Sequence, residues 1–147
     1  MPHFQKCLAP KGKSLDNLLI IKALAFSFSG GIGIHYWNCE GYDFLKGKDI
    51  VVLGTPHLNN VVYNMYAKVI GIDLNNIDLE MQYQKIDWNG FRFMFMAYND
   101  RDMREIQLSL IESELVQAIG RARALRTDAR VEVYSNLPLL VSDKFVY

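Results

Sequence analysis

The run DIVVLG, residues 49–54, constrains the fold of this chain more than any other feature of its sequence. Its consecutive β-branched residues are followed by Gly54, Thr55 and Pro56, so we expect a buried strand whose carboxyl end opens into a loop. An unbroken apolar run of this kind is typical of a parallel strand that is covered on both faces. Parallel strands require crossover connections, which are usually helices.

Residues 59–70 follow this strand with apolar side chains at helical spacing, and Gly71 is a suitable helix stop. These apolar side chains belong to Val62, Tyr66, Val69 and Ile70. We interpret the segment as a crossover helix. Residues 81–98 then form two strand patterns on either side of Asn89-Gly90, and this dipeptide favours a tight hairpin turn.

A long helix is predicted after the hairpin, with Asn99 or Asp100 as its cap. Its apolar positions keep a spacing of three or four up to about Arg126. They are Met103, Ile106, Leu110, Ile111, Leu115 and Ile119. The alternating residues 129–134 predict a final strand.

The amino-terminal third is less clearly patterned. We interpret residues 1–14 as a loose lead-in, and residues 15–28 as either a helix or a buried strand, because their apolar run is too continuous for periodicity to decide. Residues 34–37 form a short aromatic strand pattern, and residues 139–147 are a tail.

These elements predict one α/β domain over residues 1–147, with a mainly parallel open sheet, helices packed on it and the 81–98 hairpin as an insertion. Open α/β sheets bind ligands at the carboxyl ends of their strands. We therefore expect ligand contacts in the loops after Trp37 and Leu53, and at the end of the long helix.

Composition narrows the class of protein. The chain has 16 basic and 16 acidic residues and is half apolar, which argues against disorder and against a free-standing basic nucleic-acid binder. Cys7 and Cys39 lack a Cys-x-x-Cys partner, and the apolar stretch at residues 18–28 is shorter than a membrane-spanning helix. We expect a cytoplasmic protein without a membrane partner.

Three arginines close the long helix in the string QAIGRARALR, residues 117–126. Gly120 permits close approach of a backbone or a phosphate, and guanidinium groups bind phosphate oxygens through two hydrogen bonds at once. The helix dipole alone also favours a basic last turn. The residue types are therefore compatible both with a phosphate-binding site and with an ordinary basic helix end.

The order of these residues resembles motif VI of the superfamily 2 helicases, in which Gln, two variable residues and Gly-Arg are followed by further arginines. The version with Gly-Arg-Ala-Arg is similar to that of Dicer-like and innate RNA-sensor helicases. The resemblance implies that Arg121 and Arg123 are catalytic, reaching ATP between two RecA-like lobes, with Gln117, Gly120 and Arg126 at the ATP site or between the lobes. The common pattern has Arg where this chain has Ala124, so the second arginine role falls to Arg123 or Arg126.

Gly41-Tyr42-Asp43, which precedes the 49–54 strand, is similar to helicase motif V. By this resemblance Asp43 belongs to the ATP-site or interlobe group, and a second group contacts nucleic acid. The second group contains Gly41, Tyr42, Thr55 and His57. The wider strings around both motifs are similar to helicase-like proteins of phages and integrating elements, over roughly residues 32–138.

The hairpin carries alternating aromatic residues, which are Trp88, Phe91, Phe93 and Phe95. They form either a stacking surface for bases or the buried face of the hairpin. The second interpretation is the more general one for such a pattern.

A helicase also needs a Walker A phosphate loop and an acidic Mg²⁺ site on a first lobe, and we find neither motif here. Gly12-Lys13-Ser14 imitates the end of a Walker A but lacks its first glycine, and the three histidines lack metal-ligand spacing. We therefore expect no metal ligands in this chain and no ATP hydrolysis by it alone.

The resemblance thus implies the second RecA-like lobe of an ATP-dependent DNA or RNA helicase or translocase. ATP and Mg²⁺ would be cofactors of the complete enzyme, with a first lobe supplied in cis or in trans. The alternatives are a non-catalytic module that binds nucleic acid or a replication partner, and a small-molecule enzyme that uses the Gly54–His57 loop.

Overall fold

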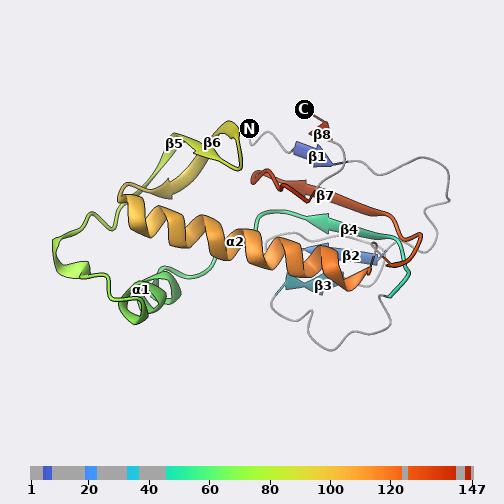
Figure 1. Cartoon of the computed structure of the whole chain (residues 1–147), viewed down its shortest axis with the longest axis horizontal. Helices are drawn as coiled ribbons and strands as arrows, with labels where there is room; N and C mark the ends of the chain where they lie inside the picture. Colours follow the sequence, from blue (N-terminus) through green and yellow to red (C-terminus); the bar gives the residue numbers. More distant parts are fainter. Residues whose placement is uncertain are drawn as a thin grey trace. The chain divides into compact units, whose positions relative to one another are not determined.

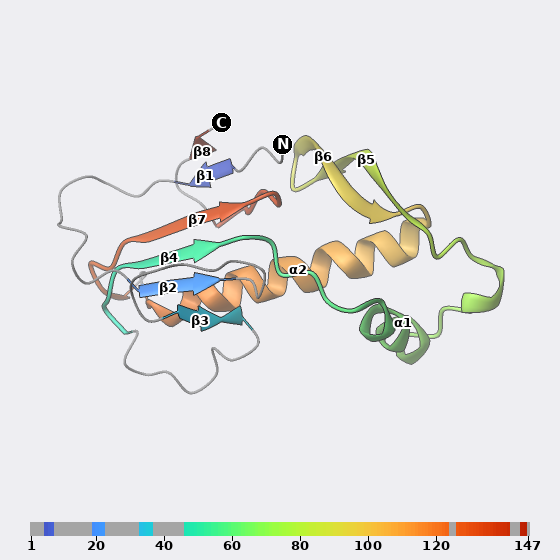
Figure 2. The ribbon, with the colours of Figure 1, turned by 180° about the vertical axis from the view of Figure 1, so that it is seen from behind.

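The computed structural model describes residues 5–7, 19–22, 33–36, 46–123, 126–141 and 145–146. The chain divides into two compact units, and Figures 1 and 2 show the ribbon from opposite sides. Unit 1 comprises residues 1–56 and 114–147, and unit 2 comprises residues 57–113. Each unit is described by itself below.

The described part of unit 1 is built on a six-stranded sheet with the order β3-β2-β4-β7-β1-β8 (Figure 1). Its central strands are parallel. β2 (Leu19–Lys22) pairs with β3 (Gly33–His35) and with β4 (Ile50–Leu53), and β4 pairs with β7 (Val131–Ser135). The predicted α/β class is therefore correct, and the sheet is mixed because its other edge is antiparallel.

That antiparallel edge comes from the two ends of the chain. β1 (Gln5–Cys7) pairs with β7, and β8 (Phe145–Val146) pairs with β1. The interpretation of residues 1–14 as a loose lead-in and of residues 139–147 as a tail is wrong at these positions. Strands of two or three residues are too short to show the alternation of apolar and polar side chains that marks a strand in a sequence. They are recognised only from their pairing at the edge of β7.

The central strand β4 confirms the prediction from DIVVLG. Ile50 and Val52 are fully buried, Val51 is almost so, and the strand is parallel to both neighbours. Gly54 follows with a φ of 87°, a conformation that favours glycine. For residues 15–28 the structure shows strand β2 at Leu19–Lys22, and the rest of that stretch lies outside the described residues.

The connection from β4 to the parallel strand β7 contains all of unit 2, so the helix after β4 is not the crossover by itself. The long helix α2 (Arg101–Arg121) returns the chain to the sheet. Its last part lies along one face of the sheet, in front in Figure 1 and behind in Figure 2. Leu115 and Ala118 are buried there, as is Ala122 directly after the helix.

Unit 2 contains the predicted hairpin. β5 (Met81–Trp88) and β6 (Phe91–Tyr98) pair antiparallel along their full length. The turn residues Asn89 and Gly90 have φ values of 53° and 80°, as expected for a type I′ turn.

The aromatic residues of the hairpin follow mainly the buried-face interpretation. Phe95 is 2% exposed, and Phe91, Phe93 and Trp88 are half-buried. Phe93 and Phe95 meet edge to face with ring centroids 5.9 Å apart. This face is therefore a packing surface over most of its length, with Trp88 at its outer end.

Helix α1 (Asn60–Val69) confirms the prediction for residues 59–70, with Asn59 as its cap. Its buried residues are Tyr63 and Ala67, which share a cluster with Tyr98 and Met103. The apolar residues that defined the helical pattern lie elsewhere, since Tyr66 is 49% exposed and Val69 and Ile70 are exposed further. Apolar residues of this helix lie on all its sides, so its sequence alone does not show which face is buried. The position of the hairpin decides the buried face. The short 3-10 helix η4 (Leu74–Asn76) follows α1.

Helix α2 begins after Asp100, whose carboxylate accepts the Met103 N–H at 2.9 Å, so Asp100 is the cap. Its buried positions include Gln107, which no hydrophobic pattern selects. The Gln107 amide accepts from Tyr98 N–H and donates to the carbonyl oxygen of Met96, at 3.2 and 3.1 Å. This side chain satisfies backbone groups at the end of β6 that lack a strand partner.

Candidate functional site

The arginine segment, which we define as residues 117–123 and 126, closes α2 in unit 1. Gln117, Gly120 and Arg121 share one face of the helix by their spacing of three and four. Gln117 and Gly120 are exposed, as are Arg123 and Arg126, and Arg121 is half-exposed. The residues that the motif VI resemblance selects therefore present accessible polar groups.

The helix ends at Arg121, earlier than the predicted end near Arg126. The N–H groups of Ala122 and Arg123 bond to carbonyl oxygens three residues back, which tightens the last turn. Arg123 then has a φ of 52°, in the left-handed region where helices commonly stop. Arg123 and Arg126 therefore follow the helix instead of lying on it.

The last carbonyl groups of this turn are bound by other parts of unit 1. The Gly47 N–H donates to the Ala122 carbonyl oxygen at 3.0 Å. The Thr127 hydroxyl donates to the carbonyl oxygens of Ala122 and Arg123, at 3.3 and 3.0 Å. These bonds replace the helical partners that the last carbonyl groups lack.

The segment before β4 is held against the strand that follows the arginines. Asp49 Oδ1 accepts the Arg130 N–H at 2.8 Å, and the Ile50 N–H donates to the Arg130 carbonyl oxygen at 2.9 Å. Residues 46–49 come shortly after Gly41, Tyr42 and Asp43, which lie outside the described residues. The described residues that follow Gly41-Tyr42-Asp43 thus contact the arginine segment through Gly47 and the strand after it through Asp49 and Ile50.

This contact lies at the amino edge of β4 and β7. The end of the long helix, where we expected ligand contacts, therefore does not lie with the loops at the carboxyl ends of these strands. α2 leads into β7, so its end meets the amino end of that strand, and Gly47 lies just before the amino end of the neighbouring parallel strand β4.

Thr55 lies at the opposite, carboxyl edge. Its hydroxyl is within 3.1 Å of the Ser135 hydroxyl and accepts the Asn136 N–H at 3.1 Å. In the described structure this side chain connects the ends of β4 and β7. The structure therefore does not bring Thr55 together with the arginine segment.

His57 belongs to unit 2. It is an exposed residue, but its ring packs against Phe95 with ring centroids 5.4 Å apart. Burial of the ring lowers the pKa of His57 below its ordinary value. The imidazole is therefore neutral at pH 7, and it can offer a phosphate a hydrogen bond but no charge.

The structure adds residues that the sequence did not single out. Gly47 and Thr127 hold the arginine segment in place through the bonds above, and Asp49 accepts the N–H of Arg130, which follows that segment. The φ of 72° at Gly47 is a conformation that glycine adopts without strain. No sequence motif identified these three residues, because the partners of Gly47 and Asp49 are about 75 to 80 positions away in the chain, and the Thr127 hydroxyl donates to backbone carbonyl groups.

Two structural findings concern ligands and membranes. Within the described ranges, no three or more His, Cys, Asp or Glu side chains gather closely enough to hold a metal ion. No helix in the described part of the chain is both long and apolar enough to cross a bilayer.

Comparison with known proteins places the chain in no family. No family model, no curated protein and no solved structure matches it.

Proposed function

We propose that this chain is the second RecA-like lobe of an ATP-dependent nucleic-acid helicase or translocase. The observation that carries the proposal is the 3.0 Å hydrogen bond from Gly47 N–H to the Ala122 carbonyl oxygen. It joins the segment that follows Gly41-Tyr42-Asp43 to the turn that carries Gly-Arg-Ala-Arg. In a helicase, motifs V and VI exchange information about nucleotide and nucleic acid, and a backbone hydrogen bond between the segments beside the two candidate motifs supports this assignment.

The chemistry of the arginine segment fits a phosphate group. A Cβ atom added at Gly120 would meet no atom of the described structure within 4 Å, so this position is open to a close approach. Arg121 lies directly after it and is half-exposed, which leaves its guanidinium accessible to a phosphate from outside the chain. Bound ATP and Mg²⁺ would supply the phosphoryl group whose charge grows during transfer, and Arg121 would stabilise that charge.

The other arginines extend this role. Arg123 and Arg126 are exposed after the helix end, where either can contact the ATP or the partner lobe. The first RecA-like lobe, in cis or in trans, would hold most of the nucleotide. DNA or RNA would bind near Gly41 and Tyr42, and the protein would act in the cytoplasm.

The decisive experiment compares ATP hydrolysis by the complete two-lobed enzyme with that of its Arg121→Ala variant, in the presence of single-stranded DNA or RNA. Loss of an arginine finger lowers the rate by roughly 10³–10⁵-fold. We expect a loss of at least 10³-fold, with nucleotide binding largely retained. Lys68→Ala is the control, because Lys68 is an exposed cation of unit 2, and it should leave the rate unchanged.

A rate within a few-fold of wild type for Arg121→Ala would show that Arg121 is not the finger. If the complete protein also bound nucleic acid equally well with and without ATP, the non-catalytic binding module would replace the helicase assignment. In that case the arginines would serve as a basic helix end that contacts phosphates of the strand.

A further inference from the structure

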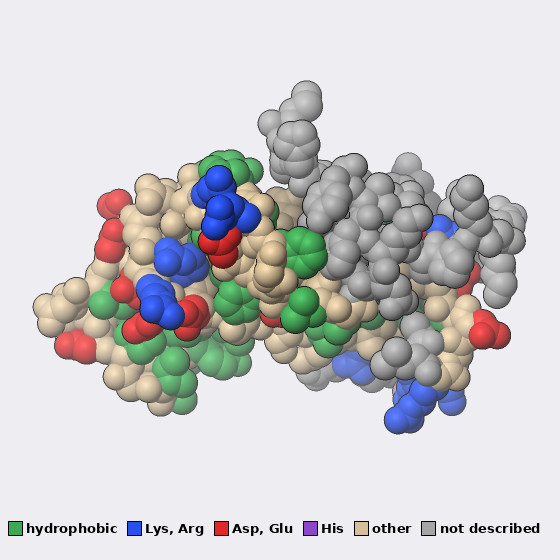
Figure 3. Space-filling view, turned by 45° about the horizontal axis from the view of Figure 1, so that its top comes forward, with side chains coloured by type: hydrophobic (Ala, Val, Ile, Leu, Met, Phe, Trp, Pro, Cys, Tyr) green, Lys and Arg blue, Asp and Glu red, His purple; other side chains and the backbone are tan. Residues whose placement is uncertain are grey.

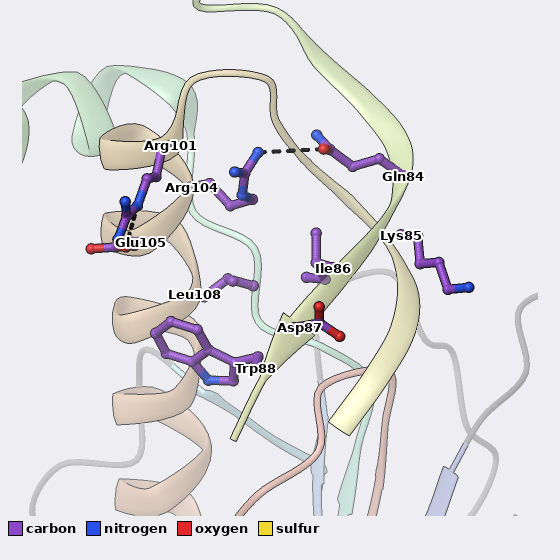
Figure 4. Close-up of a pocket in the computed structure, with 9 residues that line it drawn as sticks. All are labelled: Gln84, Lys85, Ile86, Asp87, Trp88, Arg101, Arg104, Glu105 and Leu108. Carbon is purple, nitrogen blue, oxygen red and sulfur yellow. Dashed lines mark hydrogen bonds and ion pairs between the residues drawn. The ribbon is translucent and has the colours of Figure 1, made fainter. Parts of the chain in front are cut away.

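A pocket with a volume of about 380 Å³ lies in unit 2 between β5 and the first turns of α2 (Figure 4). The strand contributes residues 84–88 to its lining, and the alternate residues Gln84, Ile86 and Trp88 share one face of the strand. The helix contributes one face, with Arg101, Arg104 and Leu108 among its residues. Ligand sites are commonly of this size, and this pocket lies in a different unit from the arginine segment.

Arg104 is held in a fixed position at one end of the pocket. Its Nη1 atom donates to the carbonyl oxygens of Tyr98 and Asn99, at 3.0 and 3.1 Å, and lies 3.3 Å from Gln84 Oε1. Its Nε and Nη2 atoms, which carry the other three N–H groups, make no hydrogen bond to any described residue. A guanidinium anchored by one nitrogen keeps its other edge available for a two-bond contact with an oxyanion.

The charges around the pocket leave an excess of positive charge. The carboxylates that line it are Asp87 and Glu105, and each is paired with an arginine, at 2.7 Å to Arg92 and 3.1 Å to Arg101. Arg104 has no carboxylate partner among the described residues. Figure 3 shows basic side chains on this face over the hairpin and the adjoining part of α2, with acidic side chains among them.

The other end of the pocket is apolar and aromatic. Leu108 and Ile86 line its middle, and Trp88 lies beyond them, away from Arg104 (Figure 4). The Trp88 indole is fixed by its N–H, which donates to Glu112 Oε2 at 3.1 Å, and the residue remains half-exposed. Strand geometry separates the Gln84 and Trp88 ends by about 13 Å, enough to span a nucleotide.

We infer that this pocket binds a nucleotide unit, with its phosphate on the free edge of Arg104 and its base against Trp88. Arginine provides the two-bond contact that a phosphate needs, and an indole face stacks with any base. The ligand is either a free mononucleotide or one unit of a single strand, since both present the same phosphate and base. The inference is independent of the ATP site that we propose at the arginine segment.

Trp88 supplies the readout. The chain has two tryptophans, so the Trp37→Phe background leaves Trp88 as the sole indole fluorophore. Titration with adenosine 5′-monophosphate and with a twelve-residue oligothymidylate should quench this fluorescence if a base stacks on the ring. Anisotropy of a labelled oligonucleotide with the unmodified chain provides a measurement that does not depend on the Trp37 substitution.

Arg101→Ala and Lys68→Ala are the matched pair of variants. Each removes one exposed cation from a helix of unit 2, but only Arg101 lines the pocket. Arg101→Ala also releases Glu105 beside the bound phosphate, so we expect about tenfold weaker binding. Lys68→Ala should change affinity less than twofold.

Each outcome of the titration is informative. Quenching by the mononucleotide identifies a free nucleotide as the ligand, and quenching by the oligonucleotide alone identifies a single strand. The inference is overturned if neither ligand quenches Trp88. It is also overturned if Arg101→Ala binds like Lys68→Ala, or if a peptide with a free carboxylate competes as well as the nucleotide.

Discussion

Two buried tyrosines of unit 2 differ in how their hydroxyl groups are satisfied. The Tyr63 hydroxyl accepts the Leu58 N–H at 3.0 Å, whereas the Tyr98 hydroxyl is buried without a hydrogen-bond partner among the described residues. Their rings meet edge to face, with centroids 5.8 Å apart. Burial raises the pKa of both residues, so both hydroxyls are neutral at pH 7.

This difference predicts opposite effects for the same substitution. Tyr63→Phe leaves a backbone N–H without its acceptor and should lower the free energy of unfolding by about 1–2 kcal/mol. Tyr98→Phe removes an unsatisfied hydroxyl and should leave that free energy unchanged or raise it by up to about 1 kcal/mol. Urea denaturation of the two variants checks the prediction, and an equal loss in both would show that Tyr98 has a partner after all.

At the level of elements, the glycines of the hairpin turn and of the arginine segment have opposite conformational requirements. Gly90 has a φ of 80°, while Gly120 lies within α2, and an added Cβ would meet no atom within 4 Å at either position. The cost of a side chain therefore comes from the backbone alone. Left-handed backbone costs an L-residue about 1–2 kcal/mol, and alanine favours a helix over glycine by about 1 kcal/mol.

Gly90→Ala should therefore lower the thermal midpoint of the chain, and Gly120→Ala should raise it. The expected changes in unfolding free energy are about 1 kcal/mol in each direction, measured by calorimetry under identical conditions. The strand register that depends on the Asn89-Gly90 turn adds to the loss at Gly90. A stabilising Gly90→Ala would contradict the type I′ assignment of this turn.

For the whole molecule, the neutral net charge conceals an uneven distribution. Unit 1 has 11 basic and 8 acidic residues, whereas unit 2 has 5 basic and 8 acidic residues. The basic excess thus belongs to the unit that carries the arginine segment. Any salt-sensitive contact with a nucleic-acid backbone outside the unit 2 pocket should therefore depend on cations of unit 1.

Lys46→Glu and Lys68→Glu test this expectation, because both lysines are exposed and only Lys46 belongs to unit 1. Lys46 lies beside the Gly47 contact with the arginine segment. Lys46→Glu should weaken binding of single-stranded nucleic acid about fivefold, and reduce the slope of log K against log salt concentration by about 1. Filter binding between 50 and 200 mM salt measures both the affinity and its salt dependence. An equal effect of Lys68→Glu would show that the uneven charge distribution between the units does not determine where the nucleic acid binds.

Local sequence patterns predicted the elements whose causes are local. The β-branched run at residues 50–53 forms β4, Asn89-Gly90 forms the hairpin turn, and Asp100, one of the two predicted candidates, caps α2. Each of these features depends on steric preferences and hydrogen bonds within a few residues, so the amino-acid order alone determines it. The candidate arginines were likewise found from their order along the chain.

The tertiary structure decided what depends on distant partners. It pairs β1 and β8 at an edge of the sheet, ends α2 at Arg121, and buries Gln107 against the backbone of β6. It also places the arginine segment at the amino edge of β4, away from Thr55. These outcomes depend on hydrogen bonds between residues far apart in sequence, such as Gly47 and Ala122, whose partners are fixed only when the sheet has formed.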